Sequence, residues 1–210
     1  MSATVDIEYV NDFTVKQKPI YEAISRLFDV ILSFVSLVIA LPFILLTAIA
    51  IKTEDGGPVM YSQERVGKNG KVFIIYKMRS MCINADNIGS SETDIDDQRI
   101  TKVGRFIRKT RIDELPQLAN ILLGHMKIIG PRPLVAEQID EFSQENPEFV
   151  NRLVVKPGLT GLAQVNGGND MGPVEKLQYD LGYIRNRGFV IDLKIIVKTV
   201  LVVLTGDGAR

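Results

Sequence analysis

The strongest constraint on this chain is a long apolar segment, LFDVILSFVSLVIALPFILLTAIAI, from Leu27 to Ile51. A helix rises ~1.5 Å per residue, so a segment of this length could cross a hydrocarbon core of ~30 Å. The segment starts too late and is too long for a secretory signal, and it lacks a small-residue cleavage pattern. We therefore expect a membrane-associated helix near the start of the chain.

Pro42 lies in the middle of this segment. Proline removes one backbone donor and clashes with the carbonyl four residues earlier, so it kinks a helix. Asp29, Ser33 and Ser36 follow one another at helical spacing and form a partly polar stripe. Basic residues flank both ends, whereas a spanning helix normally has them on one side. We therefore expect a re-entrant helix-break-helix over residues 20–52, broken at Pro42, with a single spanning helix as the alternative.

The remaining sequence predicts a small domain with little β structure. Short apolar strands near residues 59–61 and 72–76 flank a Gly-rich turn and predict a β-hairpin. Residues 99–108 lead into a helix near residues 115–122, and further helices are expected at residues 135–153, with a break at Pro147, and at residues 174–186 and 191–204. We expect a flexible arm at residues 1–19 and a compact domain at residues 53–210, which the resemblance described below identifies as a cytoplasmic catalytic domain. The fold class is mostly α with a small β-hairpin (α+β), with amphipathic interfacial helices around the catalytic domain.

Charge and cysteine content exclude several classes of function. The chain has 25 basic and 25 acidic residues, so no global positive field favours nucleic acid as a partner. Cys82 is the single cysteine and cannot form an internal disulfide. His125 is the single histidine and cannot build a histidine-rich metal site.

Two adjacent carboxylates, Asp113 and Glu114, lie among basic residues that include Arg108. Pro116 is tolerated only in the first turn of a helix, so Asp113 is expected at or near a helix N-terminus. The positive partial charge there stabilises a carboxylate and a phosphate in the same place. An ionised aspartate can attack phosphorus if a metal or an arginine neutralises the phosphate. The alternative is that the pair only caps a helix.

Metal and phosphate ligands are available in the same region. Mg²⁺ binds through one or two carboxylates plus substrate phosphates, so Asp113 and Glu114 suffice as metal ligands. Arg108 can offer a bidentate fork to a phosphate. Arg132 follows Pro131 on a stiff, proline-flanked corner and loses little entropy on binding. Together with the apolar segment, these residues predict a phosphate-handling enzyme at a lipid surface.

Several motifs occur together in an order that resembles the bacterial sugar transferases, the small monotopic phosphoglycosyl transferases. They are the proline-containing apolar segment, YSQERVGKNGKVFIIYKMRSM (61–81), RIDELPQLANIL (111–122), GPRPL (130–134), KPGLTGLAQVNG (156–167) and DLKIIVKTV (192–200). The resemblance covers nearly everything from Tyr21 to Leu204. In one departure from the family pattern, Gly168 stands where an arginine is usual, and tryptophans often found nearby are missing.

The resemblance implies a specific reaction. Members of the family move a sugar-1-phosphate from a UDP-sugar to undecaprenyl (polyprenyl) phosphate, release UMP and initiate surface polysaccharide or glycan assembly. It implies that Asp113 is the nucleophile of a covalent phosphosugar intermediate, that Glu114 supports it, and that Mg²⁺ bridges to the diphosphate. It also implies a monotopic protein of the inner membrane with its catalytic domain facing the cytoplasm.

The same resemblance extends to the substrate-binding residues. The candidates are Arg108, Pro131, Arg132, Lys77, Arg79, Gln164 and Asn166. Arg108 corresponds to the family's phosphate-binding arginine, and Lys77 and Arg79 lie in its Lys-x-Arg-Ser segment. From the residues alone, Gln164 and Asn166 in a Gly-rich loop could hydrogen-bond a uracil or could close turns.

A non-enzymatic membrane scaffold of polysaccharide assembly is the alternative function. In that case Asp113 and Glu114 act only as helix caps and affect only folding. The sequence leaves open which sugar is transferred, and also the oligomeric state, with a homodimer as one option.

Overall fold

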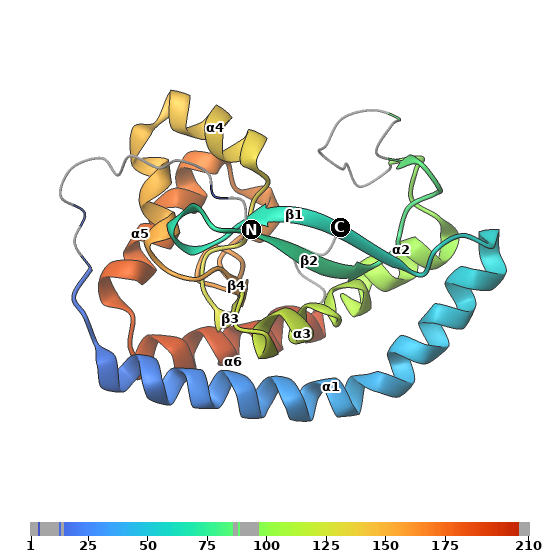
Figure 1. The fold of residues 1–210 in the computed structure, drawn as a ribbon, viewed down its shortest axis with the longest axis horizontal. Helices are drawn as coiled ribbons and strands as arrows, with labels where there is room; N and C mark the ends of the chain where they lie inside the picture. Colours follow the sequence, from blue (N-terminus) through green and yellow to red (C-terminus); the bar gives the residue numbers. More distant parts are fainter. Residues whose placement is uncertain (1–3, 5–12, 14, 86–87, 89–96, 206–210) are drawn as a thin grey trace.

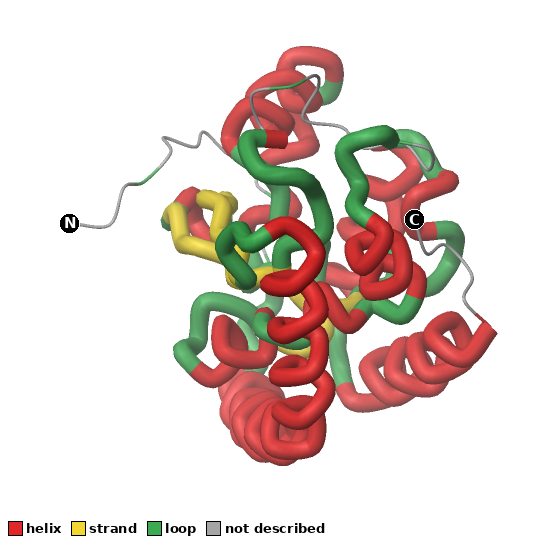
Figure 2. Tube along the Cα trace, turned by 90° about the vertical axis from the view of Figure 1, so that its right-hand side faces the viewer, coloured by secondary structure: helices red, strands yellow, loops and turns green. Residues whose placement is uncertain are grey.

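The computed structural model describes residues 4, 13, 15–85, 88 and 97–205 (Figure 1). These residues are mostly helical and contain two small sheets of two strands each. In the turned view of Figure 2 the strands lie among helices and loops and form no extended sheet. The predicted fold class, mostly α with a small β-hairpin, is confirmed for the described residues.

Helix α1, Pro19–Asp55, is the longest element. It begins with a proline in its first turn, which is favoured there, and ends at Gly56 in the left-handed conformation (φ 73°). The helix continues through Pro42, so the expected division into two helices at a break is not confirmed. Figure 1 shows instead that α1 bends, running along the lower edge and then turning up towards α2. A bend accommodates the proline ring at the cost of one backbone hydrogen bond.

The exposure of α1 is the reverse of that in a soluble protein. Its buried residues include the polar Asp29, Ser33 and Thr47. Its exposed residues are large and apolar, and they include Leu27, Phe28, Ile31, Phe34, Val38, Ile39, Phe43, Leu46 and Ile49. By length and composition α1 could cross a membrane, and only 17% of its most apolar window is buried within the described structure. Exposed apolar surface of this extent indicates contact with lipid or another apolar partner.

The predicted hairpin is confirmed. Strands β1, Met60–Val66, and β2, Val72–Met78, pair antiparallel with Met60 opposite Met78 and Val66 opposite Val72. The turn contains η1, Lys68–Gly70, a short 3-10 helix. Two buried hairpin residues, Phe73 and Ile75, pack against residues that follow the carboxylate pair: Leu118, Ile121 and Met126. The hairpin therefore covers the segment that carries the carboxylates.

The carboxylate segment differs from the prediction in one respect. Helix α2, Lys102–Lys109, is followed by the 3-10 turn η3, Ile112–Glu114, and then by α3, Gln117–Leu122. Pro116 immediately precedes α3, so Asp113 lies in η3, before the helix. Asp113 therefore lies near the start of α3, in the turn that precedes it rather than in the helix itself.

The second sheet was missed from the sequence. Strand β3, Lys127–Ile129, pairs parallel with β4, Gly158–Thr160. Each strand has three residues, too few for a period-two pattern to stand out. This sheet holds the Gly-Pro-Arg-Pro corner, which follows β3 directly, against the loop before β4.

The C-terminal part forms the main core. It contains α4, Ala136–Glu145, the 3-10 segments η4, Pro147–Val154, and η5, Gly168–Asp170, and the helices α5, Pro173–Asn186, and α6, Phe189–Thr205. Its buried residues include Ile129, Ile139, Phe149, Leu153, Leu181, Ile184 and Ile195. Helix α6 buries Ile195 but exposes a row of apolar residues: Phe189, Val190, Leu193, Val197, Val200, Leu201, Val203 and Leu204. Its expected position as an amphipathic interfacial helix stays a prediction.

Candidate active site

Asp113 is a buried carboxylate that is not paired with any residue that the structure describes. It lies in η3, whose first turn is set by Arg111 in the left-handed conformation (φ 57°) and closed by a hydrogen bond from Glu114 N to Arg111 O of 3.2 Å. The residue is only 8% exposed. Within the described part of the chain, its side chain has neither an ion pair nor a hydrogen bond.

The environment of Asp113 opposes its ionisation. Burial, and after it the negative charge of Glu114, raises the pKa of the Asp113 carboxyl, which is about 6 when all neighbouring charges are included. The cations of Lys77, Arg108 and Arg132 act in the opposite direction. At neutral pH Asp113 is therefore largely ionised, but its anionic form is less stable than that of an exposed aspartate.

Glu114, unlike Asp113, is paired with cations and has a lowered pKa. Its Oε1 accepts from Arg132 Nη2 at 2.6 Å and from Lys77 Nζ at 3.2 Å. Burial alone would raise the pKa of Glu114, but these two cations outweigh it and hold that pKa well below the usual range. Strand β2 supplies Lys77, and the proline-flanked corner supplies Arg132. Glu114 therefore ties the hairpin to this corner.

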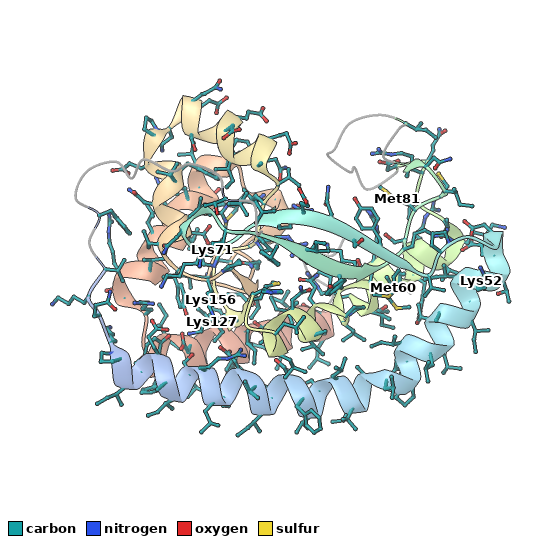
Figure 3. All side chains as sticks on the ribbon, viewed as in Figure 1. Lys52, Met60, Lys71, Met81, Lys127 and Lys156 are labelled. Atoms are coloured by element: carbon teal, nitrogen blue, oxygen red, sulfur yellow. The ribbon has the colours of Figure 1, made fainter. Side chains whose placement is uncertain are left out.

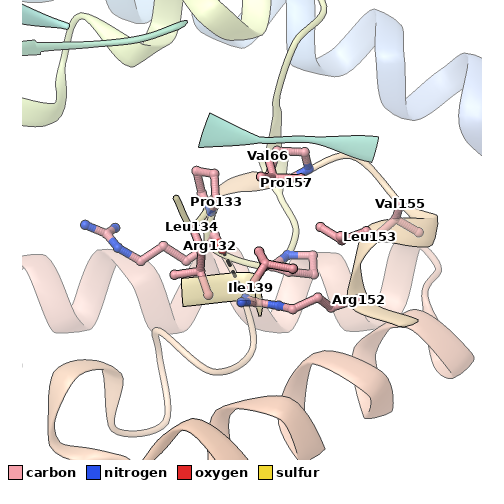
Figure 4. Close-up of a pocket in the computed structure, with 10 residues that line it drawn as sticks. Val66, Arg132, Pro133, Leu134, Ile139, Arg152, Leu153, Val155 and Pro157 are labelled. Carbon is pink, nitrogen blue, oxygen red and sulfur yellow. Dashed lines mark hydrogen bonds between the residues drawn. The ribbon is translucent and has the colours of Figure 1, made fainter. Parts of the chain in front are cut away.

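A second, fully buried arginine holds the corner in place. Arg152 Nη2 donates to Arg132 O at 3.0 Å and to Asp180 Oδ2 at 2.7 Å. Figure 4 shows the bond to the Arg132 backbone, and shows the Arg132 side chain extending away from Arg152. The side chains of Arg152 and Asp180 are 6% and 3% exposed, so their charges are paired inside the core. This pair was not predicted from the sequence, because its members lie on different elements, η4 and α5, and have no local signature.

Arg108 faces the same carboxylates from α2. Its Nε donates to Ser80 Oγ at 2.8 Å. Burial lowers the pKa of Arg108, and the nearby charge of Asp113 is the largest effect opposing that decrease. The structure thus brings the cationic side chains of Arg108, Lys77 and Arg132 together around Asp113 and Glu114.

Arg79 is directed elsewhere. It is 7% exposed, and its Nη2 forms an ion pair with Asp55 at the end of α1. Its Nε and Nη1 are buried and have no hydrogen-bond partner among the residues that the structure describes. The substrate-binding role expected for Arg79 stays a prediction, since its observed ion pair serves the junction between α1 and β2.

Gln164 and Asn166 also have contacts away from the carboxylate pair. Asn166 donates to Leu162 O at 2.7 Å and accepts from Lys198 Nζ at 2.7 Å. It lines a surface groove of about 490 Å³ together with residues of α5 and α6. Both polar atoms of the Gln164 side chain are buried and form no hydrogen bond with the described part of the chain. Their contact with a nucleotide stays a prediction.

A divalent cation suits the two carboxylates. Within the described residues no group of three or more His, Cys, Asp or Glu side chains could hold a metal. Mg²⁺ needs fewer protein ligands when substrate phosphates supply the rest. The Asp113 carboxylate is buried, unpaired and raised in pKa, so a cation beside it would relieve its charge. Glu114 already shares its Oε1 with two cations and would contribute less.

Comparison with known proteins gives the family. The family model described as bacterial sugar transferase matches residues 20–206. A UDP-N-acetylgalactosamine-undecaprenyl-phosphate N-acetylgalactosaminephosphotransferase from Aeromonas hydrophila is 43% identical over 195 residues, which are 91% of this chain and 46% of that protein. An undecaprenyl-phosphate galactose phosphotransferase from Salmonella typhimurium is 41% identical, covering 89% of this chain and 41% of that protein.

A shorter relative matches over most of its length. The putative undecaprenyl-phosphate N-acetylgalactosaminyl 1-phosphate transferase of Bacillus subtilis is 45% identical over 154 residues, which are 73% of this chain and 86% of that protein. The chain spans less than half of the Aeromonas and Salmonella relatives. The family match nevertheless covers both α1 and the whole carboxylate site. The chain therefore belongs to the bacterial sugar transferase family.

Proposed function

We propose that this protein is a phosphoglycosyl transferase that moves a sugar-1-phosphate from a UDP-sugar to undecaprenyl phosphate and so initiates polysaccharide assembly. The names of the Aeromonas and Salmonella relatives support this acceptor and this type of transfer. The observation that carries the proposal is the buried, unpaired Asp113 carboxylate surrounded by three cationic side chains. A carboxylate that only capped a helix would be bonded to backbone N–H groups, and Asp113 is not.

The chemistry follows from the different states of the two acids. An Asp113 carboxylate oxygen attacks the phosphorus that carries the sugar, and the bond from that phosphorus to the UMP oxygen breaks. UMP leaves with the bonding electrons, and the sugar phosphate remains on Asp113 as an acyl phosphate. An oxygen of the acceptor phosphate then attacks the same phosphorus and releases the Asp113 carboxylate. Because Asp113 has no ion pair to break, its oxygen is available for the first step.

The neighbouring residues bind the diphosphate of the donor and orient the side chains of the site. Arg132, 41% exposed at its side chain, reaches the site surface while its backbone is fixed by Arg152. Arg108 offers a guanidinium to the diphosphate. Glu114 keeps Lys77 and Arg132 in place by accepting from both. We assign Mg²⁺ to Asp113 with Glu114, where it would neutralise the charge of the diphosphate when bound.

The exposed apolar face of α1 supports a location at the membrane, where the lipid acceptor resides. We further propose that α1 is re-entrant, with both ends on the cytoplasmic side where nucleotide sugars are found. The bend of α1 seen in Figure 1 and the basic residues on both of its flanks support this topology.

The test is a UMP-release assay on the detergent-solubilised full chain with undecaprenyl phosphate, Mg²⁺ and a panel of UDP-sugars. The panel contains N-acetylgalactosamine, galactose and glucose, the sugars named for relatives. We expect UMP release with at least one donor and loss of at least ~10³-fold in Asp113→Asn. A labelled sugar should remain on the wild-type protein after denaturation when the acceptor is omitted. Full UMP release by Asp113→Asn would disprove the covalent mechanism.

A further inference from the structure

The C-terminal end of α1 is fastened to the helix that carries Arg108. Glu54 Oε1 accepts from Lys102 N at 2.8 Å, and Glu54 Oε2 accepts from Val103 N at 3.2 Å. These are the first two N–H groups of α2, which have no partner inside that helix. The next one, Gly104 N, donates to the Thr101 side chain at 2.9 Å. A carboxylate at the end of α1 therefore completes the N-terminal cap of α2.

A second connection runs from the adjacent residue of α1. Asp55 forms an ion pair with the buried Arg79, whose own backbone N–H donates to Val59 O at 2.8 Å. The next residue, Ser80, accepts from Arg108 Nε through its hydroxyl at 2.8 Å and from Thr101 N through its carbonyl at 3.1 Å. Asp55 therefore reaches Arg108 through Arg79 and Ser80.

Packing makes this junction compact. Ile51 of α1, Met78 of β2 and Ile107 of α2 form one buried cluster, each at most 2% exposed. In Figure 3 Lys52 and Met60 mark the junction on the right-hand side, where α1 ends and β1 begins, with Met81 nearby. Helix α2 has only eight residues, so a shift of its N-terminus moves Arg108 in its last turn as well.

We propose that Glu54 and Asp55 are positioning residues that fix Arg108 relative to Asp113, so that the end of the apolar helix sets how the site holds a phosphate. The proposal rests on the proposed function for the role of Arg108. It assigns a task to two acids outside the carboxylate pair and explains why Arg79 is turned towards α1. Glu54 and Asp55 act through other residues and need no contact with substrate.

The first test measures the junction itself, without substrate. Hydrogen-deuterium exchange is followed on the full chain in detergent for wild type, Glu54→Ala and Glu54→Gln. We expect amides in residues 102–109 to exchange about fivefold faster in Glu54→Ala and less so in Glu54→Gln, which keeps one acceptor oxygen. Residues 173–186 should be unchanged. Glu145→Ala, at an exposed glutamate at the end of α4, is the control. Unchanged exchange in residues 102–109 would overturn the proposal.

The second test asks whether Glu54 acts through Arg108. The dissociation constant for UDP-N-acetylgalactosamine with Mg²⁺ is measured by calorimetry for wild type, Glu54→Ala, Arg108→Lys and the double variant. We expect Glu54→Ala to weaken binding about fivefold in the wild-type background and by much less when Arg108 is already lysine. Equal weakening in both backgrounds, or none in the wild type, would overturn the proposal. Failure of the wild type to bind would count against the proposed function, while the exchange experiment still decides the junction.

Discussion

Two neighbouring carboxylates in this protein are driven in opposite directions by their surroundings. Glu114 is paired with Arg132 and Lys77, which depress its pKa, whereas Asp113 is buried without a partner and its pKa is raised. An acid that is tied up in ion pairs organises the site, and an acid that is left unpaired can react. The two roles expected from the family resemblance therefore correspond to two different electrostatic environments.

The raised pKa of Asp113 has a consequence for stability. A folded-state pKa of about 6, against 3.8 for the ordinary group, means that the folded protein binds this proton more tightly than the unfolded chain. Protonation of Asp113 therefore stabilises the folded state. Its contribution to the free energy of unfolding is complete below about pH 4 and is lost as the pH rises through 6. Asparagine is neutral at every pH, so Asp113→Asn should gain stability over wild type as the pH rises, by about 1–3 kcal/mol at pH 7.5.

Thermal melts of both proteins at pH 4.5, 6 and 7.5 in a chelating buffer test this expectation. The chelator matters because a bound cation would itself relieve the charge. A melting temperature of Asp113→Asn that falls below that of wild type at pH 7.5 would show that Asp113 is a structural ion-pair partner instead.

Residues near the carboxylates that lie in recognisable sequence motifs, such as Lys77, Arg108 and Arg132, could be named as candidates from the sequence. The partners that hold them were not predictable in the same way. Arg79 pairs with Asp55, 24 residues earlier, and Arg152 pairs with Asp180, 28 residues later. Such pairs depend on which elements pack together, and no local pattern in the sequence indicates them.

At the scale of elements, local signals predicted structure better than distant pairing. The β-hairpin was predictable because its strands and turn are contiguous. The parallel pair β3 and β4 was not, because its strands are short and separated by α4 and η4. The proline in α1 predicted a distortion correctly but not its form, since the rest of the helix is long enough to continue past one lost hydrogen bond.

The contact between α2 and the end of β2 depends on a glycine. A Cβ atom at Gly104 would lie 1.9 Å from Ser80 O, too close for the backbone to remain in place. We expect Gly104→Ala to destabilise the protein by about 1–3 kcal/mol and to reduce UMP release by moving Arg108. The matched control is Gly182→Ala in α5, where a Cβ would meet nothing within 4 Å. That change should stabilise the helix by about 0.5–1 kcal/mol. Chemical denaturation of both variants measures the difference, and equal effects of the two would contradict the close approach of α2 to Ser80.

At the scale of the whole molecule, α1 lies along one side (Figure 1). Its large apolar residues are exposed. If it is re-entrant, both of its ends lie on the same side of the membrane. The test places single cysteines at Lys16 and at Lys52 in a Cys82→Ser background, in spheroplasts and in inverted vesicles. We expect a membrane-impermeant maleimide to label both positions only in inverted vesicles. Labelling of the two positions from opposite sides would instead establish a spanning helix.

Hydrogen bonds between the start of α1 and later parts of the chain determine the order in which the tertiary structure can form during synthesis. Arg26 donates to the backbone carbonyls of Ile121 and Leu122, and Lys18 donates to the carbonyl of Arg187. Asp29 accepts from Ile128 N, and Tyr21 donates to Asp192. All of these partners leave the ribosome long after α1. During synthesis α1 is therefore complete while the hydrogen-bond partners of its polar residues have not yet been made, and the last of them come with α5 and α6. Early insertion of its apolar face into lipid protects the nascent chain from aggregation.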